Sequence, residues 1–164
     1  MKLAVTLSLE KAEQIIDSSL LIAKREKLLP LTVVVLDSGG KLIAMKSQDG
    51  SGLLRFDVAF GKAWGSLGMG ISSRLIRDRL AARPQFQTAL MTASGGQVVP
   101  VPGGVLIEDA NEITIGAVGI SGDTSEKDEY CAITAIQQAG YGTEPSQVDV
   151  DWKASCLSDT GSEN

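Results

Sequence analysis

Apolar residues recur along the chain with two different periods, and the changes between them predict the secondary structure. A spacing of three to four residues begins after Ser8 and predicts a helix from about Leu9 to Lys27. Ser8 has the kind of side chain that is favoured at a helix N-cap. An unbroken apolar run, Val33–Leu36, comes next and predicts a strand that is covered on both faces.

A glycine-rich turn, Asp37-Ser38-Gly39-Gly40, follows this strand, and Lys41–Ser47 returns antiparallel to complete a hairpin. The same two periods predict further elements along the rest of the chain. The expected helices are Leu54–Leu67, Ser73–Ala82, Pro84–Thr92 and a last one that Thr124 or Ser125 caps and that runs to about Ala139. The expected strands are Val98–Pro100, Gly104–Ile107 and Ile113–Ile120.

This order of elements predicts an α/β (α+β) domain. Strands that are joined by hairpins imply an antiparallel sheet of about five strands, and the helices before, between and after them would cover both faces. The 164 residues fit one domain, which we expect to span residues 1–142. Residues 143–164 are polar and aperiodic, so we expect a mobile tail in which Trp152 is suited to anchor the chain to itself or to a neighbouring subunit.

Charge and composition exclude several classes of function. The net charge of −5 argues against a nucleic-acid partner, because binding to phosphates needs a positive field. No apolar run approaches the roughly 20 residues that span a bilayer, so we expect no membrane partner and a cytoplasmic location. The chain contains no histidine, which excludes Ser-His-Asp and Cys-His catalysis within one chain. Histidine is also the commonest metal ligand, and we expect no metal site.

Lys62 is the candidate catalytic residue. It lies in a predicted helix between Phe60 and Trp64. A desolvated lysine has a lowered pKa and can act as a base or as a Schiff-base nucleophile. Two other roles are open: an ion pair with a carboxylate or a ligand anion, and a stem that lies along apolar surface while the ammonium stays in water.

A spaced glycine series, Gly116, Gly119 and Gly122, runs with Ser121 and Thr124 into the last predicted helix. Backbone N–H groups at such a helix start favour a carboxylate or phosphate, although close packing of strand on helix explains the glycines equally well. Asp37 is open to a ligand role or to capping its own turn. The candidate ligand-binding residues are Asp37, Gly95, Gly96, Gly103, Gly104, Gly119, Ser121, Gly122 and Thr124.

The motifs, taken in this order, resemble the GlcG-like family, also called the haem-degrading domain family. Related proteins include extracellular haem-binding sensor proteins and the C-terminal domain of one type of cobalamin adenosyltransferase. The resemblance covers roughly residues 6–140. It rests on Asp37-Ser38-Gly39-Gly40, Asp49, Ala59, Lys62-Ala63, Gly95-Gly96, Pro102-Gly103-Gly104, Gly116-Ala117-Val118-Gly119-Ile120-Ser121-Gly122 and Asp128-Glu129.

The resemblance implies a profilin-like α/β/α sandwich that assembles with itself, from dimers to octamers. It also implies haem as a candidate cofactor, although the missing histidine removes a usual ligand and Asp123 replaces the family's glycine after Gly122. The residues that remain as iron ligands are Met45, Met69, Met91, Tyr130 and Cys131.

Three functions stay open on this basis. The first, which we favour, is an accessory or small-ligand-binding protein that holds a small carboxylate or a tetrapyrrole in a glycine-lined pocket at a subunit interface. The second is a cofactor-independent enzyme on a small oxo- or hydroxy-acid, with Lys62 as base or electrostatic clamp and the amides of residues 119–123 as an oxyanion site. The third is a structural oligomer that stabilises a partner.

Overall fold

A five-stranded antiparallel sheet in the order β2-β1-β4-β3-β5 forms the middle layer of the protein. The computed structural model describes residues 4–157. The strands are β1 (Thr32–Asp37), β2 (Leu42–Ser47), β3 (Gly104–Glu108), β4 (Thr114–Ser121) and β5 (Gly142–Glu144). The expected α/β/α sandwich with about five antiparallel strands is therefore confirmed.

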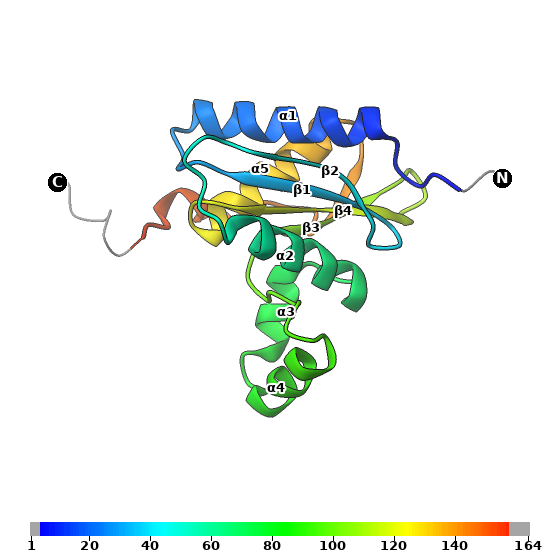
Figure 1. Ribbon diagram of the computed structural model, residues 1–164, viewed down its shortest axis with the longest axis vertical. Helices are drawn as coiled ribbons and strands as arrows, with labels where there is room; N and C mark the ends of the chain where they lie inside the picture. The colour runs from blue at the N-terminus through cyan, green and yellow to red at the C-terminus, as the bar shows by residue number, and fades with distance from the viewer. Residues whose placement is uncertain (1–3, 158–164) are drawn as a thin grey trace.

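Helices lie on both faces of the sheet, as Figure 1 shows. Two of them, α1 (Leu9–Arg25) and α5 (Ser125–Gln138), cover one face, and α2 (Arg55–Met69) covers the other. The short helices α3 (Ser73–Leu80) and α4 (Pro84–Ala93) follow α2 and extend away from the sheet (Figure 1). No helix within residues 4–157 combines the length and the apolar composition needed to cross a membrane.

Local signals in the sequence set most of these boundaries. Ser8 caps α1 by accepting a hydrogen bond from the Lys11 N–H at 3.3 Å, and Thr124 caps α5 in the same way. The buried stripe of α1 follows the helical period. It packs with α5 and the inner strands into an aliphatic core whose members include Ala12, Ile15, Ile16, Ile22, Val33, Val35, Val118 and Ile133.

The strand expected at Val98–Pro100 is absent from the described structure, so that prediction is wrong. The Val99 N–H donates to the carbonyl of Gly61 on α2, which draws this segment onto the helix and away from the sheet. Pro100 also lacks the N–H that a ladder needs. The fifth strand is β5 instead, which pairs with β3 through a three-residue polar segment too short to show a period.

The C-terminal segment packs against α5 and its N-cap through residues 152–155. The Trp152 ring stacks on Tyr130 of that helix, with ring centroids 3.6 Å apart and planes inclined by 8°. A short 3₁₀ helix, η1 (Trp152–Ala154), carries the tryptophan, and the hydroxyls of Ser155 and Thr124 lie 2.6 Å apart. Trp152 thus anchors this segment to its own chain, and residues 158–164 of the predicted tail lie outside the described residues.

Candidate functional site

The ammonium of Lys62 is buried, and the side chain is only 2 % exposed. It donates to Oδ2 of Asp128 at 2.9 Å and to the carbonyl oxygen of Ile120 at 2.8 Å. The absence of a side chain at Gly103 leaves room for the Lys62 ammonium, because a Cβ there would lie 2.9 Å from Nζ. Of the roles left open for Lys62, the structure shows the ion pair with a carboxylate, and the catalytic role stays a prediction.

Asp128 completes this buried pair from α5. Burial raises the pKa of Asp128, and the Lys62 ammonium opposes that rise. Its second oxygen, Oδ1, accepts from the Asp123 N–H at 3.2 Å, so both oxygens have a partner. The two residues therefore form a closed internal contact in the described chain.

Gly104 and Gly119 face each other across β3 and β4, directly beneath α2. A Cβ on Gly119 would overlap the carbonyl oxygen of Ala59, and one on Gly104 would overlap that of Lys62. Gly122 is covered in the same way by the carbonyl of Pro30. The structure thus shows close packing at these three glycines, and their ligand-binding role stays a prediction.

The start of α5, where an anion was expected, holds a carboxylate of the chain itself. Asp123 Oδ1 accepts from the Thr124 N–H at 2.8 Å, and Oδ2 accepts from the Leu29 N–H at 2.9 Å. Burial raises the pKa of Asp123, but these hydrogen bonds and that of Lys127 outweigh it, so the net pKa is lowered. Asp123, which departs from the family's glycine, therefore supplies the negative charge that this helix start favours.

Asp37 and Ser121 also have partners within the chain. Asp37 Oδ1 accepts from the N–H groups of Gly39 and Lys41, each at 2.9 Å, which is the turn-capping role. Buried Ser121 accepts a hydrogen bond from Arg55 Nη1 at 3.3 Å. A ligand role at either residue stays a prediction.

The two glycine pairs, Gly95-Gly96 and Gly103-Gly104, do not share a pocket. Gly95 and Gly96 are exposed and line a hollow of about 290 Å³ together with Phe60 of α2 and Val99 of the loop that follows α4. Gly103 and Gly104 lie buried under α2 beside Lys62. The structure separates these candidate residues into an open surface group and a packed internal group.

Trp64 of α2 borders two further hollows. One, of about 240 Å³, lies against the turn at Gly39 and Gly40. The other, of about 170 Å³, lies between α2 and α4 and has mostly apolar walls that include Met69 and Leu90. These hollows were not among the predicted site residues, although a tryptophan beside the apolar stripe of a helix with glycines nearby is a signal for them in the sequence.

The helix α4 buries none of its residues within the described chain. Phe86 is 42 % exposed, and the Arg83 guanidinium lies over its ring at 4.9 Å from the centroid. In Figure 1, α4 is the helix farthest from the sheet. Among residues 4–157, α4 is therefore a helix with an incompletely covered apolar face, on which Phe86 is the exposed large side chain.

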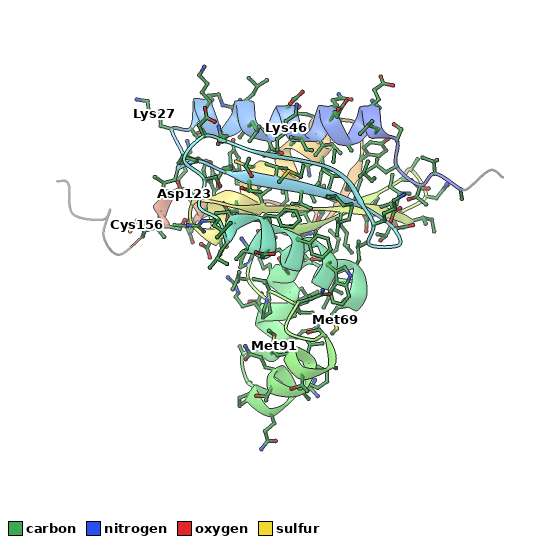
Figure 2. All side chains as sticks on the ribbon, in the orientation of Figure 1. Lys27, Lys46, Met69, Met91, Asp123 and Cys156 are labelled. Carbon is green, nitrogen blue, oxygen red and sulfur yellow. The ribbon has the colours of Figure 1, made fainter. Side chains whose placement is uncertain are left out.

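The expected iron ligands differ in how available they are. Burial raises the pKa of the Cys131 thiol, which keeps it from forming the thiolate that iron needs. Tyr130 is stacked on Trp152 and accepts a hydrogen bond from Arg25. Met69 lines the apolar hollow beside Trp64, and Figure 2 shows it at the end of α2, with Met91 of α4 also labelled on this side of the sheet. Met69 is therefore the candidate that lines a hollow with mostly apolar walls.

Glu129, next to Asp128 in sequence, is a second buried acid on α5. Oε2 lies 3.4 Å from Arg74 Nε on α3, whereas Oε1 has no hydrogen-bond partner among residues 4–157. Burial raises the pKa of Glu129 to about 7, against the opposing charges of Arg74 and Arg77. Within the same residues, no group of three or more Cys, Asp or Glu side chains is arranged to hold a metal ion.

Comparison with known proteins places this architecture in a family. The model of the haem degrading protein HbpS-like family matches residues 7–137. The chain belongs to this family. An uncharacterised 15.0 kDa protein from the dhaT-dhaS intergenic region of Citrobacter freundii is 30 % identical over 108 residues, which are 66 % of this chain and 75 % of that protein.

Solved structures share the fold. A PduOC–haem complex has a TM-score of 0.77 at 27 % identity and covers 85 % of this chain and 99 % of its own. The Klebsiella pneumoniae protein ORFY has a TM-score of 0.74 at 25 % identity, and the match covers 85 % of this chain and 94 % of that protein. A Streptomyces reticuli HbpS double mutant, at 21 % identity, 84 % and 90 % coverage and a TM-score of 0.70, shares the fold alone. The resemblance stated from the motifs is confirmed.

Proposed function

We propose that this protein is a homo-oligomeric ligand-binding or accessory protein. In this proposal, the surface of α2 and α4 is the interface between copies and holds a small carboxylate-bearing molecule. A tetrapyrrole, with haem as the first to test, is the ligand class that this surface fits best. The observation that carries the proposal is α4, none of whose residues is fully buried in the described chain and whose Phe86 is 42 % exposed.

The hollows beside Trp64 support a site that a second copy completes. Their volumes of about 170 and 240 Å³ lie below the roughly 300–1,000 Å³ of ordinary ligand pockets. A second copy packed on α4 would deepen them and bury Phe86 together with Leu90. Assembly and ligand binding would then depend on the same surface.

The side chains on this surface suit a planar ring with acidic substituents. Trp64 offers an aromatic wall, and Met69 offers a thioether as an iron ligand in place of histidine. Arg83, held over Phe86, supplies a cation for a carboxylate. The PduOC–haem complex, similar over 85 % of this chain, makes haem the first ligand to test.

The geometry favours this binding function over the lysine-dependent enzyme. Lys62 would need a free ammonium or amine that a substrate can reach. Its Nζ is instead buried and hydrogen bonded to Asp128 and to the Ile120 carbonyl. We therefore place Lys62 in the scaffold of the proposed function.

Two measurements on matched variants test the proposal. We would determine the native mass and titrate the apo protein with haem, following the Soret band. Wild-type protein should be oligomeric and show a saturable Soret shift. Leu90→Glu on α4 should reduce both the native mass and the Soret shift. Leu21→Glu, at an exposed position of α1, should change neither. A monomeric wild type would contradict the assembly, and a wild type without a Soret shift would contradict the tetrapyrrole.

A further inference from the structure

A separate hollow, of about 280 Å³, lies where the end of α1, the first turn of α5 and η1 meet. Its walls are Glu26, Lys27, Leu28, Lys127, Trp152 and Lys153. Figure 2 shows Lys27 and Asp123 at this end of the molecule, with Met91 on the far side of the sheet. The hollow is therefore distinct from the surface of α2 and α4.

Cations outnumber acids around this hollow. Lys153 Nζ lies 3.4 Å from Glu26, which Arg25 also contacts at 3.1 Å, and Lys127 Nζ lies 3.2 Å from Asp123. Within residues 4–157, the Lys27 ammonium has neither an ion-pair nor a hydrogen-bond partner, and the walls of the hollow carry three lysines against one carboxylate, that of Glu26. In a chain of net charge −5, this is a local excess of positive charge.

The backbone at Lys27 adds an independent observation. Its φ is +57°, and it ends α1 in a paired arrangement in which the Lys27 and Leu28 N–H groups donate to Lys24 and Ala23. Glycine is the favoured residue at that position, because a side chain there costs conformational energy. The chain thus places an unpaired lysine at the rim of the hollow where a glycine would fit the backbone better.

The C-terminal segment supplies Trp152 and Lys153 to the wall of the hollow. Trp152 is stacked on Tyr130, and the Ser155 hydroxyl lies 2.6 Å from that of Thr124. Lys153 lies over the Trp152 ring at 5.2 Å from its centroid, which limits its freedom. This segment lies beyond residues 7–137, so the hollow depends on chain outside the family match.

We propose that this hollow binds a small polyvalent oxyanion, of phosphate or carboxylate type, between Lys27, Lys127 and Lys153. Lysine ammonium groups act as compact point charges toward such anions. Glu26 already pairs with Arg25 and Lys153. Asp123 already pairs with Lys127 and accepts from the N–H groups of Leu29 and Thr124. These contacts limit the repulsion between the two carboxylates and the ligand. This site would act independently of the ligand proposed for α2 and α4.

The test is isothermal titration of the full-length protein with pyrophosphate and, in a second arm, with citrate at low ionic strength. Lys27→Gly removes the unpaired charge and suits the positive φ, so the fold should survive it. Lys153→Gln removes a second cation, and Lys41→Gln removes an exposed lysine at the β1–β2 turn as the matched control. Trp152 fluorescence in a Trp64→Phe background gives a second readout at the hollow itself.

Saturable binding of either anion that Lys27→Gly and Lys153→Gln each weaken about five-fold, and Lys41→Gln leaves unchanged, would support the site. Binding of only one anion would identify the ligand as phosphate or as carboxylate. Two results would overturn the proposal: no binding of either anion at millimolar concentration, or equal weakening by Lys41→Gln, which would show attraction to surface charge alone.

Discussion

Lys62 and Asp128 form an ion pair of 2.9 Å between helices that lie on opposite faces of the sheet. The lysine side chain reaches past Gly103, where a Cβ would obstruct it, and also binds the Ile120 carbonyl at the end of β4. The pair therefore joins the two helical layers directly. Because both side chains are buried, each depends on the other for neutralisation.

Removing one partner should destabilise the fold strongly. Lys62→Met leaves the Asp128 carboxylate buried without its cation, and we expect the free energy of unfolding to fall by about 3–5 kcal/mol. Urea unfolding at neutral pH would measure this. The double variant Lys62→Met/Asp128→Leu should recover much of the loss, since neither charge remains. A single variant that costs under about 1 kcal/mol would show that the pair contributes little.

The same substitution, glycine to alanine, should have opposite effects on stability at a covered glycine and at an uncovered one in the described structure. Gly119→Ala places a methyl group against the Ala59 carbonyl, so α2 must shift and we expect a loss of about 1–3 kcal/mol or more. Gly68→Ala lies in α2 with no atom within 4 Å of its Cβ in the described structure, and it should stabilise the helix by about 0.5–1 kcal/mol. Thermal unfolding of both variants would measure the two changes in stability. Equal effects would contradict the packing of α2 on β4.

Glu129 should make stability depend on pH. Its folded-state pKa of about 7 lies above its ordinary 4.5, so the fold favours the neutral acid. This stabilisation is complete below about pH 4.5 and is lost as the pH rises through 7, by an amount on the order of 3 kcal/mol at most. Glu129→Gln should therefore gain stability relative to wild type between pH 5 and pH 8.

Urea unfolding at several pH values would measure that difference. Glu10→Gln, on the exposed first turn of α1, is the matched control and should keep a constant offset from wild type. A Glu129→Gln offset that also stays constant with pH would contradict the raised pKa.

Trp152 should determine how tightly residues 150–157 are held. Trp152→Ala removes the stacking on Tyr130, an interaction of about 0.5–1.5 kcal/mol beyond its buried area. Amide exchange at Ala154, whose N–H donates to Asp151, should become about two- to ten-fold faster. Trp64→Ala, on the other face of the sheet, should leave this exchange unchanged. An exchange rate that is unchanged in Trp152→Ala would show that the stacking on Tyr130 does not hold this segment.

Elements defined by neighbouring residues could be predicted from the sequence. The caps Ser8 and Thr124, the aliphatic stripe of α1 and the turn at Gly39-Gly40 are all local signals, because they act over three or four residues. The same reasoning failed at Val98–Pro100. The Val99 N–H in this apolar run donates to the carbonyl of Gly61, a helix residue distant in sequence. The spacing of apolar residues along the run cannot distinguish this contact from pairing with a strand.

The candidate site depended on contacts that no local pattern contains. The sequence by itself determined the fold class, the family motifs, and that Lys62 and the spaced glycines are unusual. Tertiary structure decided that Lys62 pairs with Asp128, 66 residues away, and that Gly104 and Gly119 lie under α2. It also gathered Lys27, Lys127 and Lys153 around one hollow. The physical reason is that burial and pairing of charges depend on which surfaces meet when the layers pack.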